Sequence, residues 1–87
     1  MEVIYSEKAQ KDREFWKKLG NKAIMNKISA LIEDIILHPF EGIGKPEPLK
    51  GNLKGYWSRR INDEHRLIYK VRGNEIFIAA CKGHYDI

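Results

Sequence analysis

A glutamate between two prolines is a candidate for a catalytic side chain. In Pro46-Glu47-Pro48 each proline fixes its own backbone and restricts the residue before it to extended conformations, so Glu47 is held on a stiff stretch. Lys45 and Lys50 on the same stretch would favour the ionised carboxylate, which is the form that a general base needs. A solvated glutamate without a role is the alternative interpretation.

Arginines in two predicted strands could supply a cation to a reaction. Arg59 and Arg60 must point to opposite faces because the strand period is two, so only one of them can meet a given site. Arg66 shares its face with a second cation and with apolar cover. Its alternative role is a structural ion pair with Glu64 or Glu75.

Three histidines could act as an acid, and their positions alone do not choose between them. His84 follows the last predicted strand, beside Tyr85. His38 stands at a predicted helix end, and His65 begins a strand with its side chain directed away from the face of Arg66.

Glu47, Arg66 and His84 together form a set that suits the cleavage of RNA without a metal. That reaction needs a base for the 2′-hydroxyl, a cation for the crowded phosphorane and an acid for the departing 5′-oxygen. The sequence holds no CxxC, HExxH or clustered-aspartate motif, and no glycine-rich phosphate loop after a strand. We therefore expect neither a metal nor a nucleotide cofactor.

The charge of the chain is concentrated in its middle. Residues 1–44 hold seven basic and seven acidic side chains, residues 45–72 hold eight and three, and residues 73–87 hold one and two. A local excess of this kind can bind a phosphate backbone by releasing counterions, although many proteins that bind no nucleic acid also carry one.

Two amphipathic helices are expected ahead of this basic region. Ser6 can cap the first and Gly20 can end it, while Asn21 can cap the second and Pro39 can stop it. The predicted apolar stripes are Ala9, Trp16 and Leu19 in the first helix, and Ile24, Ile28, Leu31, Ile32 and Ile35 in the second.

A short strand at residues 3–5 precedes the helices, and three strands at 56–61, 65–71 and 75–81 follow them. Turn-forming residues at 62–63 and 73–74 link the last three as antiparallel hairpins, and the Gly- and Pro-rich stretch 40–55 is predicted to be a loop. The expected order is β-α-α-β-β-β, an α+β fold with a helical hairpin packed on an antiparallel sheet.

Length and composition favour one small globular domain over residues 1–87. The apolar runs are far too short to cross a bilayer, and the charged N-terminus does not resemble a signal peptide, so we expect a cytoplasmic protein that does not enter a membrane. The single cysteine, Cys81, lies in the apolar run FIAAC and is expected to be a buried thiol.

The stretch GKPEPLKGNLKGYWSRRINDEHRLIYKV, followed by IAACKGHY, resembles the YoeB branch of the RelE-like toxins of type II toxin–antitoxin systems. The opening VIYSEKA and the segment HPFEGIGKPEPLK are also similar, so the resemblance covers essentially the whole chain. It implies a microbial-ribonuclease-like α+β fold and a ribosome-dependent endonuclease that cuts messenger RNA in the A site of the bacterial 70S ribosome. It also implies silencing by a YefM-like antitoxin, and it leaves monomer and homodimer both open.

Carried over by motif, the resemblance implies that Glu47 is the general base, that Arg66 stabilises the transition state and that His84 is the general acid. It thereby selects His84 among the histidines. The resemblance further implies that Lys50 and Arg60 bind the scissile phosphate and that Tyr85 helps to position the nucleotides.

The chain departs from that branch at its end, where Gly83 precedes His84, and Asp86 and Ile87 follow the His-Tyr pair. An added carboxylate two residues from His84 could favour its protonated form or compete for the phosphate-binding cations. The alternative to a nuclease is a non-catalytic RNA- or ribosome-binding module that uses the basic face for affinity alone. An antitoxin-like partner is disfavoured, because nothing in the chain has the composition of a disordered acidic segment.

Overall fold

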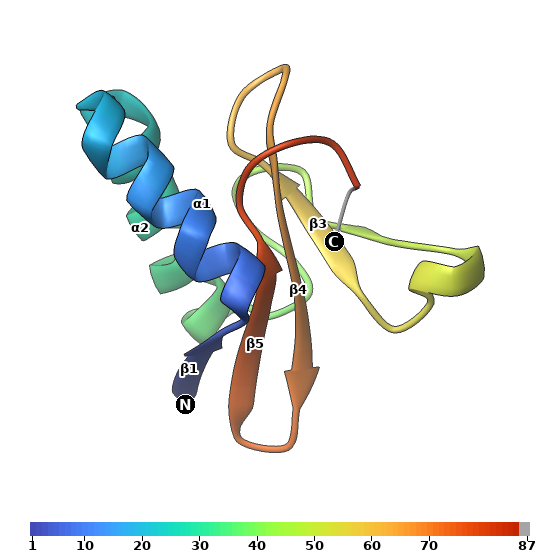
Figure 1. The fold of residues 1–87 in the computed structure, drawn as a ribbon. Helices are drawn as coiled ribbons and strands as arrows, with labels where there is room; N and C mark the ends of the chain where they lie inside the picture. Colours follow the sequence, from blue (N-terminus) through green and yellow to red (C-terminus); the bar gives the residue numbers. More distant parts are fainter. Residues whose placement is uncertain (86–87) are drawn as a thin grey trace.

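Two α-helices lie against one face of a five-stranded sheet (Figure 1) in the computed structural model, which describes residues 1–85. The strand order in the sheet is β1-β5-β4-β3-β2. In chain order the elements are β1 (Glu2–Tyr5), α1 (Glu7–Leu19), α2 (Lys22–Leu37), β2 (Glu47–Pro48), a 3₁₀ turn (Gly51–Leu53), β3 (Trp57–Arg60), β4 (Arg66–Arg72) and β5 (Glu75–Ala80).

The helical hairpin begins and ends at the predicted residues. The Ser6 side chain accepts a hydrogen bond from the Ala9 amide at 3.0 Å, and the Asn21 side chain accepts one from the Ile24 amide at 3.1 Å. Gly20 takes a left-handed conformation (φ 72°) that ends α1 and turns the chain into α2. The predicted hairpin is therefore confirmed.

The core lies between the helices and the sheet. All five predicted residues of the α2 stripe are buried, and so are Ala9 and Trp16 of α1. The prediction for Leu19 was wrong: this last residue of α1, directly before the Gly20 cap, is 62% exposed. Asp12 is buried on the inner side of α1 instead, with its carboxylate accepting the Cys81 amide at 3.0 Å. The sheet residues of this core are Ile61, Leu67, Tyr69, Ile76, Ile78 and Cys81.

The α+β class is confirmed, but the sheet is mixed rather than purely antiparallel. β1 pairs with β5 in parallel: the helical hairpin connects β1 at one edge of the sheet to β2 at the opposite edge, and the antiparallel strands that follow lead back to β5. β3, β4 and β5 are the predicted antiparallel hairpins.

Residues 40–55 are not the continuous loop that their composition predicted. Glu47 and Pro48 pair antiparallel with Ser58 and Trp57, which makes them a two-residue edge strand. An edge strand tolerates proline because one side of it needs no ladder hydrogen bonds. Of the helices in residues 1–85, none combines the length and apolar character that a membrane span requires.

Candidate active site

The face of the sheet that the helices leave uncovered is where the predicted site residues gather. Its small apolar centre is Ile68, Ala79 and Ala80, and four partly buried side chains pack against this centre: Leu49, Tyr56, Phe77 and Tyr85. We call this side of the sheet the open face. Residues opposite one another in an antiparallel pair point to the same side, so the register assigns further residues to it.

Glu47 lies on the open face, at the edge of the sheet. It pairs with Ser58, and Ser58 pairs with Ile68, so these three form one row across β2, β3 and β4. Glu47 is exposed, as its flanking prolines predicted. Among residues 1–85 no cation lies within 4.0 Å of its carboxylate, so neither Lys45 nor Lys50 is its ion-pair partner.

Arg60 and Arg66 form the next row on the same face, since the two residues pair in the β3–β4 ladder. With strands about 4.8 Å apart and about 3.3 Å per residue, the Cα atoms of Glu47 and Arg66 are roughly 12 Å apart. Glu47 and Arg66 have long side chains on the same face, so both can reach a phosphate that lies between them.

Arg66 is only 7% exposed, and the turn before β4 holds one end of its guanidinium. Its Nη1 donates to the carbonyls of Asn62 at 2.7 Å, His65 at 3.2 Å and Asp63 at 3.3 Å. Within residues 1–85 its Nε and Nη2 take part in no hydrogen bond, and it forms no ion pair with Glu64 or Glu75. The structural-pair interpretation was therefore wrong, and Arg66 is a fixed cation with donors left over.

Arg59 points to the opposite face and is fully buried. Its Nε donates to the Tyr69 hydroxyl at 3.2 Å, and its Nη1 and Nη2 bind the Asp34 carboxylate and loop carbonyls. The carbonyls that accept from it belong to His38, Glu41 and Ile43. The hydrogen bond from Arg59, followed by the one from the Ile43 amide, lowers the pKa of Asp34. Arg59 therefore fixes the start of the loop that leads to Glu47.

Two glycines let this loop pass close to α2 and β3. A Cβ on Gly42 (φ 116°) would collide with the Asp34 carboxylate that binds Arg59. A Cβ on Gly44 (φ 81°) would lie 2.6 Å from a methyl carbon of Leu31. With the Gly44 carbonyl accepting the Arg60 amide at 2.7 Å, the chain is directed along β3 into Glu47.

Replacing Arg59 by methionine is expected to lower the free energy of unfolding by about 3 kcal/mol, because the buried Tyr69 hydroxyl, the Asp34 carboxylate and three part-buried carbonyls lose their donor. Since Asp34 has a lowered pKa when folded, this pair stabilises the protein above the ordinary carboxyl pKa and loses its effect as the pH falls through the lowered value. Urea unfolding at neutral and acid pH measures both effects, and the difference between variant and wild type should shrink in acid.

Arg60→Met is the matched control for that experiment, since Arg60 is the exposed neighbour on the other face. Its unfolding free energy should stay within about 0.5 kcal/mol of the wild type. Equal losses in the two variants would show that the Arg59 cluster does not hold the loop.

The chain after β5 curves back toward β3 (Figure 1), and Tyr85 packs against the apolar centre of the open face with the His84 ring beside it. The Gly83 carbonyl accepts the Arg66 amide at 2.9 Å, which places His84 directly after a residue bound to β4. The rings of His84 and Tyr85 lie edge to face at 4.4 Å, with His84 exposed and Tyr85 half-buried.

A shallow hollow of about 320 Å³ joins Tyr85 to the Glu47 segment. It is lined by Glu47, Pro48, Leu49, Lys50, Leu53 and Tyr85. The structure therefore brings Glu47, Lys50 and Tyr85 to one hollow, beside the row of Arg60 and Arg66. Within residues 1–85 no hydrogen bond or ion pair links Glu47, Arg66 and His84 directly. Asp86 and Ile87 lie outside the described residues.

The two other histidines lie away from the open face. His38 is the exposed C-cap of α2, as predicted. His65 packs its ring against Trp16 of α1 at 4.8 Å, so its side chain is directed opposite to that of Arg66, as predicted.

Sequence reasoning did not single out Tyr56 as part of this surface. The Lys70 ammonium lies 4.7 Å from the centre of the Tyr56 ring, and the Arg72 guanidinium lies 4.5 Å from that of Phe77. The alternation of side chains along the strand could have identified Tyr56, because residues 56 and 60 point to the same face. Aromatic rings beside cations are suited to stacking bases and binding phosphates.

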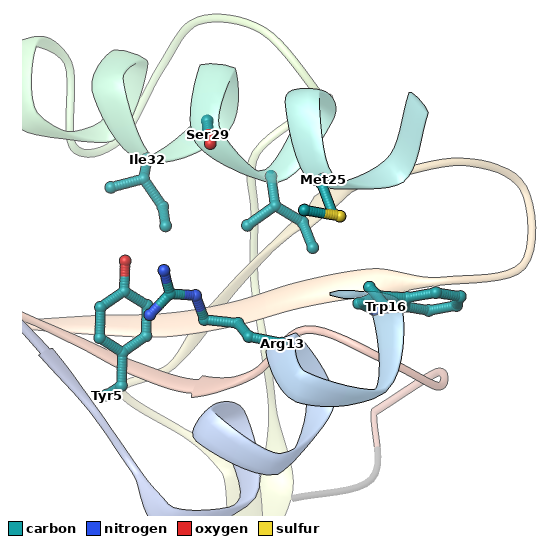
Figure 2. A pocket seen from close by; sticks show the side chains of 7 residues that line it. Tyr5, Arg13, Trp16, Met25, Ser29 and Ile32 are labelled. Atoms are coloured by element: carbon teal, nitrogen blue, oxygen red, sulfur yellow. The ribbon is translucent and has the colours of Figure 1, made fainter. Parts of the chain in front are cut away.

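Other polar and apolar features lie elsewhere in the fold. Cys81 is buried as predicted, and burial raises the pKa of its thiol to about 12. Within residues 1–85 no three His, Cys, Asp or Glu side chains are grouped as they would be around a metal ion. A hollow of about 110 Å³ lies between α1 and α2 on the covered side of the sheet (Figure 2). Beside it the Arg13 guanidinium lies 4.2 Å from the centre of the Tyr5 ring. None of the predicted site residues lines it.

Comparison with known proteins identifies similar chains along nearly the whole length. A family model described as "YoeB-like toxin of bacterial type II toxin-antitoxin system" matches residues 5–85. Toxin YoeB of Escherichia coli K12 is 52% identical over 85 residues, covering 98% of this chain and all of that one.

Solved structures agree with these sequence relationships. The YoeB/ParE toxin from Agrobacterium tumefaciens is 41% identical with a TM-score of 0.93, covering 98% of this chain and all of the other. YoeB from Staphylococcus aureus, solved as a dimer and in a heterotetrameric YoeB-YefM toxin-antitoxin complex, is 46% identical with a TM-score of 0.89 and 98% coverage of both chains.

Proposed function

This chain belongs to the YoeB-like toxin family of bacterial type II toxin–antitoxin systems, and we propose that it acts there as an endoribonuclease that cleaves messenger RNA in the ribosomal A site. The observation that carries the proposal is the strand register. It places Glu47 and Arg66 in neighbouring rows of the open face, and the carbonyl of Gly83, directly before His84, accepts the Arg66 amide.

The proposed reaction uses three side chains in three roles. Glu47 accepts the proton of a 2′-hydroxyl, and the oxygen so activated attacks the adjacent phosphorus. Arg66 donates hydrogen bonds to the phosphorane as its negative charge grows. The bond from phosphorus to the 5′-oxygen then breaks, and His84 gives that oxygen its proton. Since base, acid and cation are all side chains, these steps require no metal ion.

Binding of the substrate is assigned to the cations and rings around this centre. Lys50 lies in the same hollow as Glu47, and Arg60 pairs across the ladder with Arg66, so both are within range of the scissile phosphate. Tyr85, whose ring packs against the open face, positions the nucleotides by stacking. Arg59 is buried and bound to its own partners, so the electrostatic attraction for RNA comes from the other basic residues of segment 45–72.

Proposed partners follow from the relatives. The Staphylococcus aureus relative forms a complex with YefM and has been solved as a dimer. We assign to this chain a YefM-like antitoxin that covers the basic open face, and a homodimeric state in the absence of the antitoxin. The site of action is the cytoplasm, where ribosomes and messenger RNA are present.

The decisive experiment compares wild type with Glu47→Gln in a purified translation mixture. The glutamine keeps the shape of the side chain but cannot accept the proton, so cleavage should slow by about 10²-fold or more while ribosome binding is unchanged. Primer extension on the messenger measures the first quantity, and co-sedimentation with ribosomes measures the second.

Glu33→Gln is a suitable control, because Glu33 is an exposed glutamate of α2, on the helix-covered side of the sheet, and no step of the reaction uses it. It should cleave at nearly the wild-type rate. Full activity of Glu47→Gln would show that Glu47 is an exposed glutamate without a catalytic role. Tight ribosome binding with no cleavage by the wild type would support the non-catalytic binding module instead.

A further inference from the structure

The backbone that leads to His84 and Tyr85 is held mainly by side chains of other elements. Beyond β5 the Cys81 amide donates to the Asp12 carboxylate at 3.0 Å, and the Cys81 carbonyl accepts from Trp16 Nε1 at 2.9 Å. The Lys82 carbonyl accepts from Lys8 at 3.3 Å. Asp12 and Trp16 are 6% and 3% exposed, so α1 fixes this segment from inside the core.

The last anchor before His84 is His65. The Gly83 amide donates to His65 Nδ1 at 3.0 Å, and the Gly83 carbonyl accepts the Arg66 amide at 2.9 Å. Both polar backbone groups of Gly83 are thus bound by two consecutive residues at the start of β4. The second of those residues is the proposed catalytic arginine, so this contact ties the His84 backbone to the backbone of Arg66.

The His65 ring is itself held in place. It packs edge to face on Trp16, with ring centres 4.8 Å apart and planes at 75°, and its Nε2 lies 3.9 Å from the Glu64 carboxylate. Because the Gly83 amide is a donor, Nδ1 must be the unprotonated nitrogen and Nε2 must carry the proton. The ring therefore has one defined tautomer and one defined orientation.

We propose that His65 is a positioning residue, which fixes His84 beside Arg66 by binding the Gly83 amide. This inference rests on the proposed function, because it concerns the placement of the proposed general acid. His65 contacts no reacting atom. It acts through the single residue that separates the anchored backbone from His84.

The physical consequence is a fixed distance from acid to leaving group. His84 is exposed, and within residues 1–85 its ring contacts that of Tyr85, so the placement of the imidazole depends on the backbone of the adjacent Gly83. A displacement of about 1 Å in a catalytic group can cost about 10²-fold in rate. Loss of the His65 anchor should therefore slow the chemical step while the binding of substrate by the other cations persists.

Two substitutions separate the acceptor of His65 from its ring. His65→Phe keeps an aromatic ring against Trp16 but removes the acceptor, whereas His65→Asn keeps an acceptor close to the Nδ1 position but removes the ring. His38→Asn is the matched control, because His38 is an exposed histidine at the C-terminal end of α2.

The first readout needs no catalysis. In the free wild-type protein, nitrogen NMR should show an unprotonated His65 Nδ1, and hydrogen exchange should show a protected Gly83 amide. In His65→Phe that amide should exchange at least about tenfold faster, a change expected when a part-buried hydrogen bond is lost. His65→Asn and His38→Asn should keep its protection. A protonated Nδ1 in the wild type would overturn the proposal without the use of any variant. An unchanged Gly83 exchange rate in folded His65→Phe would overturn it as well.

The second readout is the split between kcat and KM for messenger cleavage. His65→Phe should lower kcat by about 10- to 100-fold with little change in KM, and His65→Asn should recover most of that loss. Full activity of His65→Phe with a deprotected Gly83 would refute the positioning role and leave the proposed function standing. Wild-type protein that binds ribosomes and cleaves nothing would refute the proposed function, and the exchange data would then decide the Gly83 anchor alone.

Discussion

Replacing Arg66 by alanine is expected to lower kcat for messenger cleavage about 10³-fold while KM changes less than about threefold, because the lost hydrogen bonds form chiefly in the transition state. The structure gives this residue the fixed placement that such a role needs. Nη1 is bound to the carbonyls of residues 62, 63 and 65, Nε and Nη2 form no hydrogen bond within residues 1–85, and the strand register places Arg66 on the open face. A cation held in advance of the reaction spends no free energy on reorganising as charge develops.

Alanine at this position leaves the anchor of the C-terminal segment intact, since the bond to the Gly83 carbonyl comes from the Arg66 backbone amide. Arg66→Lys keeps the charge but loses the planar fork, and it should recover only part of the rate. Arg60→Ala is the matched control: as a proposed phosphate contact it should raise KM more than it lowers kcat. A variant Arg66→Ala that binds more weakly but turns over normally would support a binding module rather than an enzyme.

The local parts of this fold could be predicted because local rules govern them. Ser6 and Asn21 cap the helices that follow them, and the five residues of the α2 stripe are buried as their spacing requires. Leu19 shows where periodicity stops being sufficient, because burial needs a partner as well as a position on a stripe.

Long-range pairing was harder to predict. The parallel alignment of β1 with β5 joins residues at the two ends of the chain, and no local pattern encodes it. The strand at Glu47 and Pro48 is equally hidden, because two prolines in three residues suggest a loop and only the partner β3 makes an edge strand of them.

Strand parity predicted that Arg59 and Arg60 would separate, but it could not say which of them would be buried. That choice depends on Asp34, which lies 25 residues earlier in the chain, and on carbonyls from the loop after α2. The role of His65 was out of reach for the same reason: its partners, Trp16 and Gly83, come from opposite ends of the sequence.

A messenger that carries a single 2′-deoxy nucleotide at the cut position is expected to resist cleavage there, with the rate falling to background. The proposed base removes a proton from the 2′-hydroxyl, so without that group Glu47 has nothing to activate and no nucleophile adjoins the phosphate. Nearly all phosphate contacts of Lys50, Arg60 and Arg66 remain, so binding in the ribosomal A site should persist. Toeprinting of the stalled complex with and without the protein separates loss of cleavage from loss of binding.

The ends of the products test the same step on the natural messenger. Attack by the 2′-oxygen leaves a 2′,3′-cyclic phosphate, or the 3′-phosphate formed when that ring opens, on the upstream fragment. The downstream fragment receives its proton from His84 and ends in a 5′-hydroxyl, so a kinase should label it without prior phosphatase treatment. A 5′-phosphate on that fragment, or efficient cutting of the deoxy messenger, would mean that water is the nucleophile. Glu47 would then have to take its proton from that water molecule rather than from the 2′-hydroxyl.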